Sequence, residues 1–139
     1  MSYFEEMRSR HLPEGEQHDE LTERVIGAAI EIHRHLGPGL TESLYEAALC
    51  HEFDLRDIPY ARQVEFDVKY KDKAIGKSRI DLLVTDSLIV ELKACEAINP
   101  IHRAQCITYL RLTGKTISLL INFNVEILKD GIKRVVLKN

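Results

Sequence analysis

The sequence has no apolar run of about 18 residues, the length at which a helix can cross a bilayer, so we expect no membrane span. Its first residues, MSYFEEMRSRHLPEGEQ, lack the basic-then-apolar order of a secretory signal, which favours a cytoplasmic location. No internal repeat or low-complexity segment divides the 139 residues. We therefore expect a single domain over residues 19–139, preceded by a mobile tail over residues 1–18.

Cysteine is scarce, and its spacing excludes two classes of protein. The three cysteines are Cys50, Cys95 and Cys106, an odd number without a CxxC pair. This pattern fits neither a disulfide framework nor a zinc knuckle. We expect all three side chains to be reduced and buried, the commonest state of this residue type.

Positive charge is also in short supply, since the net charge is −3. A negative chain counts against a nucleic-acid partner, but the acidity is uneven. Residues 1–24 hold seven acids and three bases, whereas residues 25–139 hold fifteen acids and sixteen bases. The folded part is therefore close to neutral, and a nucleic-acid partner stays open.

Apolar spacing predicts two helices at the start of the domain. Apolar residues recur at helical spacing between Leu21 and Leu36, with Asp19 as the N-cap and Gly37-Pro38-Gly39 as the stop. A second helix is expected from Thr41 to about Arg56. Its predicted buried stripe consists of Leu44, Ala47, Ala48 and Leu55.

Strands dominate the rest of the chain. Residues 64–70 alternate apolar and polar side chains, which predicts a half-buried strand. Further strands are expected over residues 80–84, 88–93 and 116–123. A helix should lie between Asn99-Pro100 and Gly114, packed through Ile101, Ala104, Ile107, Leu110 and Leu112. A terminal hairpin over residues 126–137 completes the order α-α-β-β-β-α-β plus hairpin.

Two of these strands carry ionisable residues inside apolar runs. Asp81 lies between apolar neighbours, and Glu91 and Lys93 share one face of the next strand. In an antiparallel pair the numbers of opposed residues have a constant sum, so a three-residue loop at Thr85-Asp86-Ser87 would place Asp81 opposite Glu91. A two-residue loop would put Asp81 on the other face, so the arrangement requires an odd loop or a bulge. The same register would place Arg79 opposite Lys93.

Two facing carboxylates and a lysine suit phosphodiester chemistry. Two carboxylates can hold a hard divalent cation such as Mg²⁺ or Mn²⁺, which polarises a phosphoryl oxygen and acidifies water. A neighbouring lysine can orient that water or stabilise developing negative charge. The alternative is a structural ion pair that joins Asp81 or Glu91 to Lys93 or Arg79.

Several segments together resemble the GxxExxY protein family. They cover nearly the whole of residues 20–137, in the family's order: Gly39-Leu40-Thr41-Glu42-Ser43-Leu44-Tyr45, Val90-Glu91-Leu92-Lys93-Ala94, His102-x-x-Gln105, Tyr109-Leu110 and Leu120-Ile121-Asn122-Phe123. That family is placed among the PD-(D/E)xK nuclease-like proteins. The resemblance implies an α/β (α+β) fold with a restriction-endonuclease-like core, in which helices flank a mixed central sheet.

The resemblance also implies roles for individual residues. Glu42, Asp81 and Glu91 correspond to metal ligands, and Lys93 to the catalytic lysine. Gln105 and Tyr109 correspond to residues that line the site. Candidate substrate contacts are Arg79, His102 and Tyr45. His102 is equally explained as a polar residue that is hydrogen-bonded within the protein, and Tyr45 as a residue that packs in the core. Ile80 precedes Asp81 at the position for which the P in the name PD-(D/E)xK implies proline.

The leading hypothesis is therefore a Mg²⁺- or Mn²⁺-dependent nuclease that acts on nucleic acid, DNA or RNA, with DNA favoured. The second is a non-catalytic module that binds nucleic acid or a protein through the same fold, favoured by the near-neutral charge. A purely structural oligomerisation domain would leave the strand charges unexplained. The sequence shows no clear interface, so homodimerisation and an additional protein partner stay open.

Overall fold

The computed structural model describes residues 19–137, so the tail predicted over residues 1–18 lies outside the described residues. The predicted order of helices and strands is confirmed. In chain order the elements are α2 (Glu20–Leu36), α3 (Glu42–Leu55), β1 (Tyr60–Tyr70), β2 (Lys73–Val84), β3 (Leu88–Lys93), α4 (Pro100–Thr113), β4 (Ile117–Asn122), the 3-10 helix η1 (Leu128–Gly131) and β5 (Ile132–Val136).

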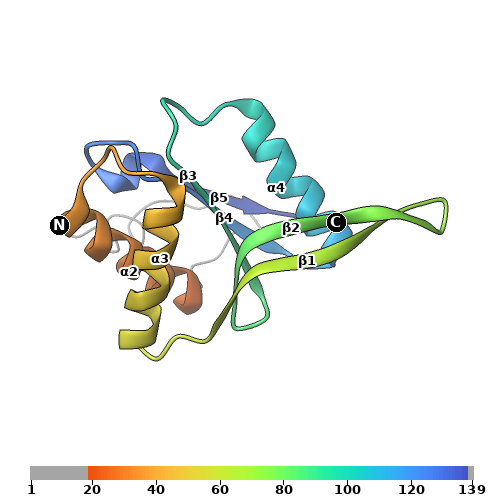
Figure 1. The fold of residues 1–139 in the computed structure, drawn as a ribbon, viewed down its shortest axis with the longest axis horizontal. Coiled ribbons are helices and arrows are strands. Elements are labelled where there is room, and N and C mark those ends of the chain that lie inside the picture. Colours follow the sequence, from red (N-terminus) through yellow and green to blue (C-terminus); the bar gives the residue numbers. More distant parts are fainter. Residues whose placement is uncertain (1–18, 138–139) are drawn as a thin grey trace.

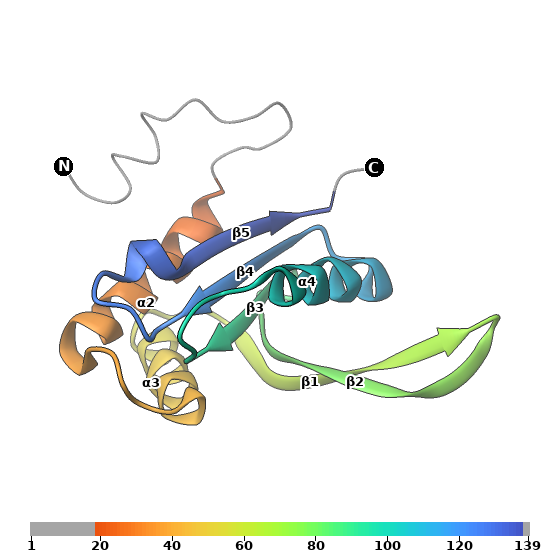
Figure 2. The same cartoon turned by 90° about the horizontal axis from the view of Figure 1, so that it is seen from above.

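The five strands form one mixed sheet in the order β1-β2-β3-β4-β5. Strands β3 and β4 are parallel, and the other neighbours are antiparallel. Helices α2 and α3 cover one face of the sheet and α4 covers the other (Figures 1 and 2). Because both faces of β3 and β4 are covered, these strands are continuous apolar runs interrupted only by a few polar residues.

Helix α2 begins and ends where the sequence indicates. The Asp19 Oδ1 atom accepts a hydrogen bond from the Leu21 N–H at 2.9 Å, which satisfies one of the free donors of the first turn. Gly37 ends the helix with a φ of +69°, a conformation that glycine adopts without a steric penalty. The apolar face of α2 then packs on the sheet.

Helix α3 has the predicted limits, but of its predicted buried stripe only Ala48 packs against the core. Leu44 and Leu55 are 52% and 66% exposed, and Ala47 is also exposed. Apolar residues of α3 lie on all sides of the helix, so their spacing in the sequence does not single out one buried face. The largest side chains decide the orientation because they bury the most area. The buried face consists of Tyr45, Glu46, Leu49, Cys50 and Phe53.

Helix α4 buries a narrower stripe than predicted. Cys106 and Leu110 are buried and Ile107 and Tyr109 pack partly buried against the core, whereas Ile101 is 69% exposed. The helix crosses only part of the sheet, so residues toward its ends stay in solvent. Its stop at Gly114, with a left-handed φ of +74°, agrees with the sequence.

The terminal hairpin expected over residues 126–137 is wrong in its first half. Residues 128–131 form the 3-10 helix η1, and the single strand β5 pairs with β4. Gly131 lies so close to the Asn122 carbonyl oxygen that a Cβ atom would clash with it. This close approach fixes the turn, and the chain returns directly to the edge of the sheet.

Cysteine burial follows the prediction for two residues of three. Cys50 and Cys106 are buried, and Cys95 is half-buried in the segment after β3; all three are free thiols. None of the helices within residues 19–137 combines the length and apolar character of a membrane-crossing segment.

Candidate functional site

The β2–β3 register brings Asp81 to Glu91, as the loop arithmetic predicts. The ladder pairs Val84 with Leu88 and Leu82 with Val90, which leaves a three-residue loop. The next opposed pair in this register is Asp81 and Glu91, and the ladder ends just before it. The two strands therefore separate at the position of the two carboxylates.

Each carboxylate there replaces a backbone acceptor on the opposite strand. The Asp81 N–H donates to Glu91 Oε1 at 3.1 Å, and the Leu92 N–H donates to Asp81 Oδ2 at 2.8 Å. These reciprocal hydrogen bonds satisfy donors that the separating strands would otherwise leave without partners. They also hold the two side chains together.

Burial and like charge make this pair electrostatically unusual. Glu91 is only 4% exposed. Its burial and the neighbouring Asp81 carboxylate raise the pKa of Glu91 to about 8, and Lys93 opposes the shift. A cation between the carboxylates would remove that penalty. The pair therefore has the chemistry of a divalent-cation site.

Two acidic residues suit a Mg²⁺ site that is completed by water and substrate, and are too few for a metal site made entirely of protein ligands. Mg²⁺ is commonly held by one or two carboxylates, with water and substrate phosphate as its other ligands. Within the described part of the chain, no three His, Cys, Asp or Glu side chains gather as a metal site. Glu42 is exposed at the start of α3 and forms no such group with Asp81 and Glu91, so its role as a ligand stays a prediction.

Lys93 lies at the end of β3, where a buried amide fixes the chain. The Lys93 carbonyl accepts a hydrogen bond from the Phe123 N–H at 2.9 Å. Asn122, only 2% exposed, accepts from the Cys95 N–H at 3.1 Å and donates to the Cys95 carbonyl at 3.0 Å. These bonds hold the backbone at Lys93 and just after it, so its side chain leaves a fixed end of the strand.

A kink in the β1–β2 ribbon lies beside Asp81. Gln63 and Asp81 face each other across the ribbon, but the ladder skips this pair, and Gln63 has a φ of +50°. Leu82 packs on the α3 side of the sheet, whereas Ile80, two positions earlier, packs on the α4 side. In a regular strand both would face the same way. The ribbon therefore turns over at Asp81.

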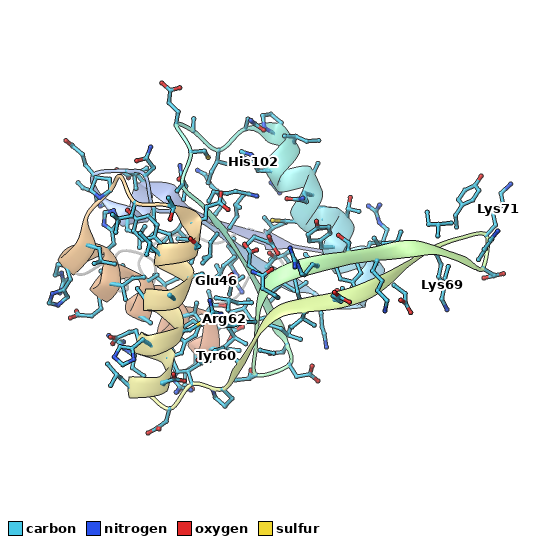
Figure 3. All side chains as sticks on the ribbon, in the orientation of Figure 1. Glu46, Tyr60, Arg62, Lys69, Lys71 and His102 are labelled. Carbon is cyan, nitrogen blue, oxygen red and sulfur yellow. The ribbon has the colours of Figure 1, made fainter. Side chains whose placement is uncertain are left out.

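Glu46, a residue that the sequence analysis missed, holds this kink from α3. Its Oε1 accepts from Gln63 Nε2 at 2.6 Å, and its Oε2 accepts from Arg62 at 2.9 Å (Figure 3). The hydrogen bond from Arg62 to Glu46 raises the pKa of the guanidinium. Glu46 is only 8% exposed and reaches the sheet from α3, one turn after Glu42.

We expect Glu46→Ala to lower the free energy of unfolding by about 1–3 kcal/mol, because it leaves Arg62 and Gln63 without their acceptor. Urea unfolding measures this change. Glu31→Ala is the control, since Glu31 forms only exposed ion pairs on α2 and its loss should change stability by less than about 1 kcal/mol. Equal effects of the two substitutions would show that Glu46 does not hold the ribbon.

Two residues predicted to line the site meet on α4. Gln105 Nε2 donates to the Tyr109 hydroxyl at 3.0 Å, and the Ser78 hydroxyl donates to the same oxygen at 3.2 Å. The Tyr109 ring also contacts Phe66 edge-on, with centroids 5.3 Å apart. This group joins α4 to the ribbon on the sheet face that carries Glu91.

The predicted substrate contacts occupy less direct positions. Tyr45 is fully buried, donates to the Gly37 carbonyl at 2.5 Å and stacks on Phe123, which is the position of a structural residue. His102 closes the capping box of α4, where its Nδ1 accepts from the Asn99 N–H at 3.2 Å (Figure 3). Arg79 lies opposite Glu65 in the β1–β2 ladder. It does not lie opposite Lys93 as predicted, because β2 has left β3 by that point.

Comparison with known proteins gives a family for this chain. A crystal structure titled SSO0001 aligns with a TM-score of 0.40 and 16% identity, over 87% of this chain and 79% of that chain. No curated protein matches the sequence. The family model described as the PD-(D/E)XK nuclease superfamily matches residues 19–135, which is most of the chain. The chain therefore belongs to the PD-(D/E)XK nuclease superfamily.

Proposed function

We propose that this protein is a divalent-metal-dependent nuclease that cleaves DNA in preference to RNA. Asp81 and Glu91 would hold Mg²⁺ or Mn²⁺, and Lys93 would act on the scissile phosphate. The observation that carries the proposal is the pair of reciprocal hydrogen bonds that joins the buried Glu91 and the half-buried Asp81 where β2 leaves β3. Membership of the superfamily supports the same reaction class.

A bound divalent cation would supply Lewis-acid activation of the phosphodiester and charge neutralisation at the carboxylates. The chain's own contribution begins with the placement of Lys93. It shares the strand face of Glu91, and the Asn122 clamp fixes the backbone that follows it. From there its ammonium can donate to a non-bridging phosphate oxygen and stabilise the charge that develops during attack.

The Gln105–Tyr109 pair would position the nucleic-acid backbone beside the carboxylates. Both side chains are half-buried on the α4 face that looks toward β2. Their amide and hydroxyl groups can donate to phosphate oxygens without adding charge. The ring contact of Tyr109 with Phe66 keeps this side of the site rigid.

The proposal predicts that Lys93→Ala lowers cleavage of duplex DNA in Mg²⁺ by about 10²–10³-fold, the usual effect of removing one donor to a developing anion. The protein should still fold and still bind Mg²⁺, because both carboxylates remain. Cleavage of supercoiled plasmid and of labelled duplexes, with matched RNA, measures the effect and the preference.

Lys115→Ala is the matched control, since Lys115 contacts the β2–β3 loop through the Asp86 carbonyl at 2.8 Å, away from the carboxylates. Its rate should equal that of the wild type. An unchanged rate in Lys93→Ala would remove Lys93 from the mechanism. Mg²⁺ binding without cleavage of any substrate would instead support the non-catalytic alternative.

A further inference from the structure

The far end of the β1–β2 ribbon projects from the domain as an arm, which we define as residues 69–77. Every residue of the arm is exposed. Both ribbon views show it extending away from the helices and from the other strands (Figures 1 and 2). Beyond Val68 the two strands pair with each other and pack on nothing else that the structure describes.

The conformation of the arm is not explained by stability. Lys71 and Asp72 form its turn with φ values of +48° and +68°, a conformation in which asparagine and glycine are favoured. Lysine is strained in this region by roughly 1–2 kcal/mol, whereas aspartate adopts it more readily. A two-stranded ribbon without a packed face is also only marginally stable in water. The arm contributes little to the core, so its presence calls for a partner outside the domain.

The charge of the arm indicates the chemistry of that partner. Lys69, Lys71 and Lys73 cluster at the tip, and none of the described carboxylates forms an ion pair with them. Closer to the domain, by contrast, Lys77 is paired with Asp67 at 3.1 Å. Figure 3 shows Lys69 and Lys71 directed outward from the ribbon. The tip is thus a local cationic surface on a chain that is acidic overall.

Two exposed apolar side chains accompany these lysines. Tyr70 is 61% exposed and Ile75 is 63% exposed. The Lys71 ammonium lies 5.4 Å from the centre of the Tyr70 ring, which places charge and aromatic surface together. Apolar side chains among phosphate-binding lysines can contact base edges, including the thymine methyl group.

We propose that the arm binds duplex DNA by entering its major groove. A two-stranded β-ribbon fits the major groove of B-form DNA, with its lysines directed at the phosphates on either side. The major groove of A-form RNA is too narrow for a ribbon, which selects DNA. This inference rests on the proposed function, because the duplex on the arm would be the one delivered to Asp81.

The position of the arm fixes the length of duplex that it needs. Lys73 and Asp81 lie on one strand, eight residues apart. At about 3.3 Å per residue the separation is roughly 26 Å along the ribbon. Because B-form DNA advances about 3.4 Å per base pair, the lysines would contact phosphates at most about eight base pairs from the cleavage point. Duplexes that extend at least this far on the arm side should gain the full contribution of the arm.

The test is duplex binding without metal, measured by fluorescence anisotropy in EDTA so that cleavage does not interfere. The triple variant Lys69→Ala, Lys71→Ala, Lys73→Ala should bind a 24-base-pair DNA duplex at least about tenfold more weakly at low salt. The slope of log affinity against log salt should fall by up to about 2.7, since each lysine–phosphate contact contributes about 0.9. Neither value should change for RNA duplexes.

The charge-matched control is Arg24→Ala, Arg34→Ala, Arg56→Ala, which removes three exposed positive charges from α2 and the end of α3. It should bind like the wild type. Thermal unfolding of both triple variants checks that the domain is intact, as expected for substitutions at exposed positions.

An arm variant with wild-type affinity and salt slope would overturn the inference. So would a wild type that prefers single strands or RNA duplexes, or one that binds no DNA. If the arm variant instead turns a dimer into a monomer in sedimentation, the arm is a contact between copies of the chain. None of these results would argue against cleavage that depends on Lys93. Conversely, weaker binding by the arm variant would support the inference about the arm even if the wild type cleaves no substrate.

Discussion

Asp81→Asn is expected to lower Mg²⁺-dependent DNA cleavage by about three orders of magnitude or more, a loss typical of removing a group that acts on the transition state. Asparagine keeps nearly the same shape, and its carbonyl oxygen can still accept from the Leu92 N–H. The substitution therefore removes one negative charge from the candidate cation site and leaves the strand separation in place. Rates on labelled duplexes, with unfolding curves, separate chemistry from folding.

Asp86→Asn provides the matched control, because Asp86 lies in the loop that joins the same two strands and its side chain is 89% exposed. It should cleave at the wild-type rate. A rate for Asp81→Asn within about tenfold of the wild type would show that Asp81 is not a metal ligand, whatever the family pattern implies.

Glu91→Gln is expected to make the metal-free protein more stable at pH 8 while it abolishes cleavage. The pKa of Glu91 is raised from 4.5 to about 8 in the folded state, so the folded protein holds a proton that the unfolded chain releases. Wild-type stability should therefore fall as the pH rises from about 4.5 to about 8. Glutamine carries no charge there, and it keeps an oxygen for the Asp81 N–H.

Thermal unfolding in EDTA at several pH values measures this effect. We expect Glu91→Gln to unfold roughly 3–5 °C higher than the wild type at pH 8, for a difference of about 1 kcal/mol, with the difference closing toward pH 4.5. Added Mg²⁺ should stabilise the wild type, because it binds only the folded state, and should leave Glu91→Gln unchanged. A wild type that gains stability as the pH rises through this range would refute the unfavourable charge at Glu91.

The sequence predicts the centre of the site because its geometry is local. A three-residue loop fixes the β2–β3 register, and side-chain alternation then decides which residues share a face. Asp81, Glu91 and Lys93 follow from those two rules. The strand separation at Asp81 does not follow, since it depends on hydrogen bonds between side chains and backbone that no spacing encodes.

The residues that support the site come from distant parts of the chain. Glu46 on α3 reaches Gln63 on β1, and the turnover of the ribbon beside Asp81 depends on the left-handed φ of Gln63. The resemblance to the GxxExxY family indicated Glu42, four residues before Glu46, and helical spacing places both acids on similar faces. Only the packing of Tyr45 and Phe53 in the core settles which acid points at the sheet.

The central claim is that Asp81 and Glu91 together hold a divalent cation, and isothermal titration calorimetry tests it most directly. Mn²⁺ and Mg²⁺ are titrated into the wild type and Asp81→Asn at pH 8. We predict saturable binding to the wild type and no saturable binding to the variant. Equal binding by both proteins, or no binding by the wild type, would contradict the claim.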